Sequence, residues 1–151
     1  MRIHRGQMIS MGFEMDQDLQ EIEQFITMWP DSSETCRDLF VRLKEYLLGF
    51  ETVSLQFIAR PGVTYSLRAT HPNQRDRPLF MMIDVIDDKP RWLSICFYGE
   101  MVSDPEERGD YVPGGLLGED GICFDLEKSD EERVSYVIGR LDEAYSVAGS
   151  L

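Results

Sequence analysis

The sequence is poor in the residues from which most enzyme sites are built. Its 151 residues include only two histidines, His4 and His71, and three cysteines. A Ser–His–Asp or Cys–His system needs a histidine that a third group orients, and zinc sites need clusters of cysteine and histidine. His4 falls near the start of the chain and His71 stands beside Pro72 in an expected loop. We therefore expect a protein that is not an enzyme and that carries no cofactor.

The few cysteines also limit the covalent structure. Cys36, Cys96 and Cys123 form no C-x-x-C motif, and three cysteines cannot all pair within one chain. Each lies among apolar neighbours, as Ile95 and Phe97 do on either side of Cys96. We expect all three to be reduced and mostly buried, which is typical of cytoplasmic proteins.

Basic residues and long hydrophobic runs are scarce as well. The chain has 15 Lys and Arg against 28 Asp and Glu, a net charge of −13. This charge opposes binding to duplex nucleic acid and to anionic membranes, so neither is an expected partner. No run approaches the ~18 apolar residues of a membrane span, and the first dozen residues lack the apolar segment of a signal peptide. The sequence predicts a cytoplasmic monomer or homodimer.

The apolar pattern predicts a single α+β domain over residues 14–151, after a flexible leader over residues 1–13. Apolar residues recur at helical spacing over 15–29, 36–47 and 134–148. Capping boxes at 31–34 and 129–132 are expected to begin the second and third helices, and Gly49 to end the second.

Between the helices the apolar period changes to two. Residues 53–60 and 63–70 alternate around Pro61-Gly62, which predicts an antiparallel hairpin. Residues 79–86, 91–98 and 121–126 are expected to add further strands, and residues 100–121 a long irregular loop. The predicted fold therefore has two N-terminal helices, an antiparallel meander of about five strands and one C-terminal helix packed on the sheet.

The predicted hairpin concentrates positive charge on one face. Arg60 and Arg68 share strand parity with Thr64 and Ser66, opposite the apolar positions. Such a face is suited to a carboxylate, a phosphate or an acidic segment of a partner protein. The alternative is that these are ordinary surface arginines that balance the acidic helices.

Two aromatic residues are candidates for the same ligand site. Trp92 and Tyr98 share a face of their strand and are expected to lie beside the arginines. The loop over residues 100–121 leaves this strand, and it either folds back to complete a ligand site or only shields the aromatic side chains.

The first helix suggests a different function. Asp18 and Glu21 are three residues apart and share one face, so they are candidate ligands for a hard cation or iron. Favourable interaction of carboxylates with the helix N-terminus explains the same residues without a metal.

The order of elements resembles a group of small bacterial domains of unknown function, the YdhG-like proteins. Three segments carry the likeness: the helix over 36–43, the hairpin over 53–65, and residues 121–126 with the helix that ends at 141–145. The resemblance implies an α+β sandwich without an assigned activity. Some YdhG-like proteins are compared with frataxin, an acidic iron carrier, so the resemblance also implies an iron carrier as the alternative to a binding module.

Overall fold

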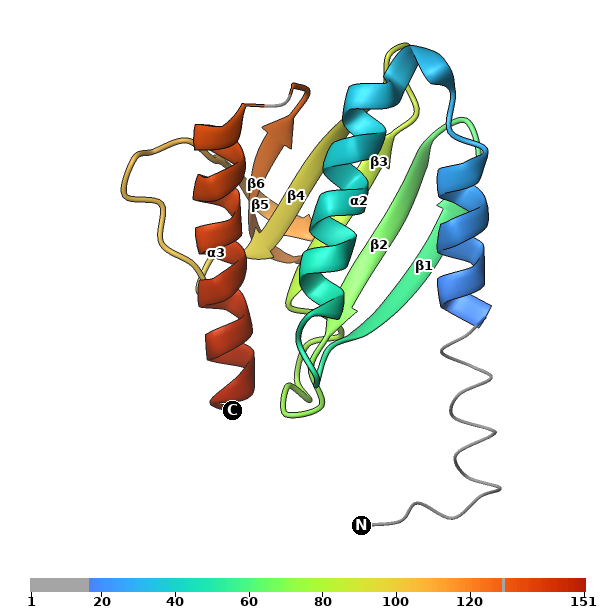
Figure 1. Ribbon diagram of the computed structural model, residues 1–151. Coiled ribbons are helices and arrows are strands. Elements are labelled where there is room, and N and C mark those ends of the chain that lie inside the picture. Colours follow the sequence, from blue (N-terminus) through green and yellow to red (C-terminus); the bar gives the residue numbers. More distant parts are fainter. Residues whose placement is uncertain (1–16, 129) are drawn as a thin grey trace, which may run out of the picture.

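The computed structural model describes residues 17–128 and 130–151 and shows one antiparallel sheet with helices on one side (Figure 1). The expected leader lies outside the described residues. The first helix spans residues 17–27. The later elements are η1 (Asp31–Ser33), α2 (Glu34–Leu48), β1 (Ser54–Arg60), β2 (Thr64–Thr70), β3 (Met81–Ile86), β4 (Trp92–Tyr98), β5 (Asp110–Leu116), β6 (Glu119–Leu126) and α3 (Glu131–Gly149).

The sheet confirms the α+β prediction and adds a strand to it. Its six strands run in the order β1-β2-β3-β4-β6-β5, and every neighbouring pair is antiparallel. β5 falls inside residues 100–121, where an irregular loop was expected. Its sequence, with Pro113 followed by two glycines, lacks the apolar alternation of a strand, and five of its seven residues are exposed. Pairing with β6 therefore forms this strand where its own pattern gives no signal.

The β1–β2 hairpin forms around Pro61-Gly62, as its sequence predicts. The Val63 N–H donates to the Arg60 carbonyl at 3.0 Å, which closes a four-residue turn. Proline fixes φ at the second position, and Gly62 adopts a φ of +83° at the third. The resulting register pairs Arg60 with Thr64 and Gln56 with Arg68, so the polar residues of the two strands share a face.

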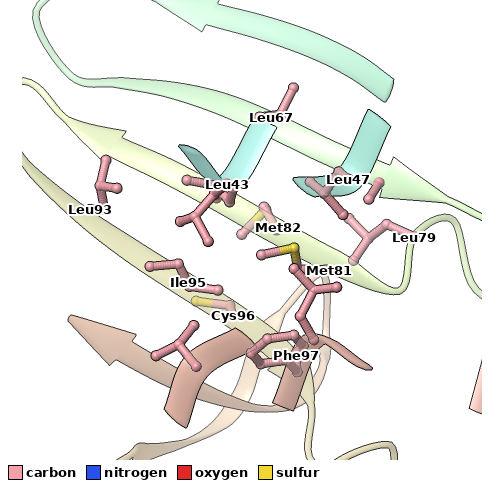
Figure 2. Packing of buried hydrophobic residues seen from close by; sticks show 14 of the residues in the cluster. Leu43, Leu47, Leu67, Leu79, Met81, Met82, Leu93, Ile95, Cys96 and Phe97 are labelled. Carbon is pink, nitrogen blue, oxygen red and sulfur yellow. The ribbon is translucent and has the colours of Figure 1, made fainter. Parts of the chain in front are cut away.

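Most of the apolar side chains of the central strands point to the face that the helices cover. Leu43 and Leu47 of α2 project onto the side chains of the sheet, among them Leu67, Met81 and Ile95 (Figure 2). All five are almost completely buried. Packing against helices therefore uses one face of the sheet, and the other face is left for other contacts.

The helix starts differ from the predicted capping boxes. Ser33 stands at the N-cap of α2 but makes no side-chain cap bond, because its hydroxyl accepts the backbone N–H of Arg91 at 2.9 Å. Asp130, one residue after the expected position, caps α3 by accepting the N–H groups of Glu132 and Arg133. Ser129 lies outside the described residues. The Ser33 hydroxyl is therefore used in a tertiary hydrogen bond instead of capping α2.

Two of the three cysteines form a disulfide, so the expectation of three thiols is wrong. Cys96 on β4 and Cys123 on β6 are register partners, with a Cα–Cα distance of 4.2 Å. No local pattern predicts this pairing, because it depends on the register of two strands that are not consecutive. Cys36 is free and buried, and burial raises the pKa of its thiol to about 12. Its thiol is therefore protonated and unreactive in the native protein.

Among the described residues, none of the helices combines the length and the apolar character that crossing a membrane requires.

The packing of α3 on the sheet predicts how much stability is lost when one of its buried side chains is shortened. Leu141 is fully buried between this helix and the sheet. Leu141→Ala should lower the free energy of unfolding by about 2–5 kcal/mol, the range for emptying a buried leucine site. The exposed Val147 on the same helix provides the control, since Val147→Ala should change stability by under about 0.5 kcal/mol. Equal losses in urea unfolding of the two variants would contradict this account of α3.

The cysteine pairing predicts a thiol count. The folded protein, purified without reductant, should show no fast-reacting thiol, and denaturation should expose one thiol per chain. Denaturation with reductant should expose three. Three thiols in the denatured protein without reductant would show that Cys96 and Cys123 are not bonded.

Candidate functional site

The face of the sheet opposite the helices carries a row of polar side chains in its centre. Ser66 on β2 lies directly opposite Asp84 on β3, and Asp84 lies opposite Ser94 on β4. Arg60 and Arg68 project from the same face, one on each side of this row. Arg60 lies opposite Thr64, and Thr64 and Arg68 are the residues two positions before and two positions after Ser66 on β2. Strand geometry separates these two positions by about 13 Å along the strands, with Ser66 midway between them.

A pocket of about 160 Å³ lies over this polar row and brings both predicted arginines together. The strands β1, β2 and β3 form its floor, and the turn between β5 and β6 forms one wall. Its lining residues are Ile58, Arg60, Thr64, Ser66, Arg68, Met82, Asp84, Gly115 and Leu117. Since β5 and β1 are the two edges of the sheet, the sheet curls until the tip of one edge hairpin meets the opposite edge.

The wall of the pocket depends on a tightly folded turn. Asp120 accepts the Gly114 N–H at 2.9 Å and the Tyr111 hydroxyl at 2.7 Å. Both hydrogen bonds lower the pKa of Asp120, so its carboxylate holds the turn at neutral pH. A Cβ atom on Gly115 would lie 2.0 Å from Val112 Cγ1, so only glycine fits there. The sequence therefore builds this wall with glycines and one pinning carboxylate.

A second contact holds the base of the same hairpin. Arg77 donates from Nε and from one terminal nitrogen to the Glu119 carboxylate, at 3.0–3.2 Å, and it also reaches Glu100 at 3.1 Å. The Arg77 guanidinium lies 4.5 Å from the centre of the Tyr98 ring. Because Glu119 begins β6, this ion pair fixes the hairpin against the loop that carries Arg77.

The two pocket arginines differ from most of the other arginines in the described residues, six of which form a salt bridge with a carboxylate. Within the part of the chain that the structure describes, no carboxylate lies within salt-bridge distance of Arg60 or Arg68. Arg77, Arg91 and Arg108 each have such a partner. The only hydrogen bond from the Arg68 side chain to a described residue is a long one, 3.5 Å from Nε to the Ser66 hydroxyl. The positive charge at the pocket is therefore available to an anion.

One carboxylate lies between these charges. Asp84 is partly buried, and burial raises its pKa above the ordinary range against the opposing effects of a Ser66 hydrogen bond, Arg68 and Arg60. Two guanidinium groups and one carboxylate give the pocket a net charge near +1 when Asp84 is ionised. This local charge is opposite in sign to the charge of the whole chain.

Tyr98, one of the two predicted aromatic site residues, does not line the pocket. It is 1% exposed, and its hydroxyl has no hydrogen-bond partner among the described residues. Burial and the negative charge of Glu119 raise the pKa of this hydroxyl, while Arg77 and Arg68 lower it. The buried ring of Tyr98 therefore packs against the Arg77 guanidinium.

Trp92, the other predicted aromatic, belongs to a different hollow. Its indole Nε1 donates to Asp88 at 2.7 Å, and its side chain lines a larger space of about 820 Å³ at the N-terminal end of α2. The charges of the residues around that space cancel. Three are acidic, Glu34, Asp88 and Glu127, and three are basic, Lys89, Arg91 and Lys128.

Arg91 does not make this larger space an anion site. Its guanidinium lies about 5 Å from the rings of Phe25, Trp29 and Tyr65, and it donates to Asp87 at 2.9 Å. The charge of Arg91 is thus held in a cage of aromatic rings under the first helix, and it supports the helix rather than a ligand.

The metal alternative finds no support in the first helix. The Asp18 carboxylate accepts the backbone N–H of Phe57 at 3.2 Å, so it satisfies the outer edge of β1. Across residues 17–128 and 130–151, no three or more His, Cys, Asp or Glu side chains form a group that could hold a metal ion, and this includes Asp18 and Glu21.

Comparisons with protein-family models, with curated proteins and with solved structures found no match for this chain. The resemblance to YdhG-like proteins stays a prediction.

Sequence reasoning found the two arginines and gave, as one of two alternatives, a segment over residues 100–121 that folds back over them, but it missed Asp84 and the strand β5 in that segment. The segment over 79–86 has an apolar residue at nearly every position, which hides the one polar side chain that faces away from the helices. Pairing β3 with β2 in the observed register places Asp84 opposite Ser66, and therefore between the rows of the two arginines. Nothing local to residues 114–118 indicates that they reach the opposite edge of the sheet.

The raised pKa of Asp84 predicts a specific pH effect on stability. The folded state holds the Asp84 proton more tightly than the unfolded state does. Ionisation of Asp84 therefore lowers the stability of the folded state as the pH rises above the ordinary aspartate pKa of about 3.9. Asp84→Asn should therefore gain stability relative to wild type between pH 3 and pH 7. Urea unfolding at several pH values measures this difference, and a difference that does not change with pH, or that falls as the pH rises, would contradict the burial of the charge.

Proposed function

We propose that this protein is a binding module for a small anionic group, which it holds in the pocket over the open face of the sheet. The supporting observation is the pair Arg60 and Arg68, which line one pocket and have no carboxylate partner among the described residues. Arginine presents several N–H donors in a planar fork that matches carboxylate and phosphate oxygens. Two such groups around one space form a suitable anion receptor.

The alternative of ordinary surface arginines explains less. In an acidic protein with 28 carboxylates, most exposed arginines find a partner, and several do so here. Arg60 and Arg68 instead lie where the fold holds Asp84 in a partly buried position between them. A purely structural role would predict direct ion pairs, which stabilise the folded protein without leaving an open pocket.

The size of the pocket limits the ligand. An engineered cavity of about 150 Å³ holds one benzene molecule, and pockets for drug-sized ligands measure about 300–1,000 Å³. A space of about 160 Å³ therefore accommodates one carboxylate- or phosphate-bearing group, and it is too small to enclose a nucleotide. The group can belong to a free small molecule or to an acidic residue of a partner protein.

Other features of the sequence-based hypothesis remain predictions. A cytoplasmic location stays a prediction, and the Cys96–Cys123 disulfide is more typical of oxidising compartments. The oligomeric state, monomer or homodimer, also stays a prediction.

The pocket predicts the effect of removing its charge. Hydrogen bonds to charged groups contribute about 1.5–3 kcal/mol, so Arg60→Gln and Arg68→Gln should each weaken binding of inorganic phosphate about tenfold or more. Isothermal titration calorimetry at constant ionic strength measures the dissociation constants.

Arg75→Gln is the matched control, because Arg75 is exposed on the loop after β2 and does not line the pocket. It removes the same charge and should leave the affinity within twofold of wild type. Equal losses in all three variants would show a general charge effect. Unchanged affinity in the double variant Arg60→Gln/Arg68→Gln, at unchanged stability, would overturn the proposed function.

A further inference from the structure

We propose that the pocket selects small carboxylates that also carry a hydrogen-bond donor, a hydroxyl or an ammonium group, and that Asp84 is the residue that selects them. This inference rests on the proposed function, since it names the class of ligand that the same pocket takes. It follows from the placement of the Asp84 carboxylate, an acceptor, between the donor groups of Arg60 and Arg68 on the open face of the sheet.

The lining presents both kinds of partner in one small space. Arg60 and Arg68 offer only donors, because a guanidinium has no acceptor atom. Asp84 is the one carboxylate in the lining, and when ionised it offers only acceptors. A ligand that is only an acceptor satisfies the arginines but places its negative charge against Asp84. A ligand with a donor beside its carboxylate satisfies both.

The register of the sheet shows where the two ends of such a ligand would lie. Asp84 stands directly opposite Ser66, in the row between those of Arg60 and Arg68. Residues on one face of a strand are separated by about 7 Å, so Asp84 is one row from each arginine. The carboxylate of a ligand with two or three carbons would contact a guanidinium while its donor reaches the row of Asp84.

Asp84 has one side-chain hydrogen-bond donor among the described residues, the Ser66 hydroxyl. Its neighbours in the row are the hydroxyl groups of Ser66 and Ser94, and it forms no salt bridge with any described residue. An ionised carboxylate accepts several hydrogen bonds, and a partly buried one is stabilised by each bond it gains. A ligand donor at this position therefore strengthens binding more than a donor exposed to water.

A pair of isosteric ligands tests this selectivity in the unmodified protein. Glycolate and propionate have the same number of non-hydrogen atoms and the same charge, and they differ by a hydroxyl in place of a methyl group. Calorimetric titration at pH 7 and constant ionic strength should show glycolate binding about tenfold more tightly than propionate, the ratio expected for one hydrogen bond to a charged group. In Asp84→Asn the ratio should fall to within twofold, while binding of propionate improves because the repulsive charge is gone.

The outcomes separate the two proposals. If neither carboxylate nor phosphate binds, the proposed function itself fails. If both carboxylates bind with equal affinity in wild type, the anion site stands and the role of Asp84 is overturned. Equal binding that strengthens for both ligands as the pH falls would show that protonated Asp84 donates to the anion, which also contradicts the proposal. Arg75→Gln should keep the wild-type ratio, and its loss there would contradict a role confined to the pocket.

Discussion

Packing of the described helices on a single face of the sheet is the constraint that determines most of this structure. The first helix, α2 and α3 all cover that face (Figure 1). Alternation along the central strands directs most of their core residues to the same face. The opposite face must satisfy its half-buried residues without a helix. It does so through curling of the sheet, the Cys96–Cys123 disulfide and the β5–β6 hairpin, whose tip reaches across to β1–β3. The pocket is a product of that curling.

The long segment after β4 is a fixed part of the fold. Asp104 accepts the backbone N–H groups of Arg108 and Gly109 and the hydroxyl of Tyr136 on α3, and these bonds lower the pKa of its carboxyl group. The hairpin that follows is held by the ion pair between Arg77 and Glu119. Half-exposed Leu117 at the tip is therefore supported from both sides. Under the proposed function, a wall held in this way would position a ligand without a large conformational change on binding.

The sequence predicts what depends on local period, and it fails where strands that are distant in the chain meet. Alternation around Pro61-Gly62 is enough to place Arg60 and Arg68 on one face. The same parity puts Trp92 and Tyr98 on that face. Parity does not show how far along the strand each residue lies from the arginines, and these two residues lie at opposite ends of β4. The cysteine pair, the strand β5 and the contact of its hairpin with the far edge all depend on the order of strands, which no short segment encodes. Asp84 was hidden for a local reason, because β3 is otherwise apolar on both faces.

The location of the anion is the central claim, and an NMR titration of the ¹⁵N-labelled protein tests it most directly. Adding phosphate at constant ionic strength should shift the side-chain Nε–H signals of Arg60 and Arg68 together with backbone amides of β2, β3 and residues 114–118, and these shifts should saturate with one dissociation constant. Amides around the larger hollow at the start of α2 should not move. Saturating shifts at residues 32–36 and 88–92, with the signals of Arg60 and Arg68 unchanged, would contradict the account.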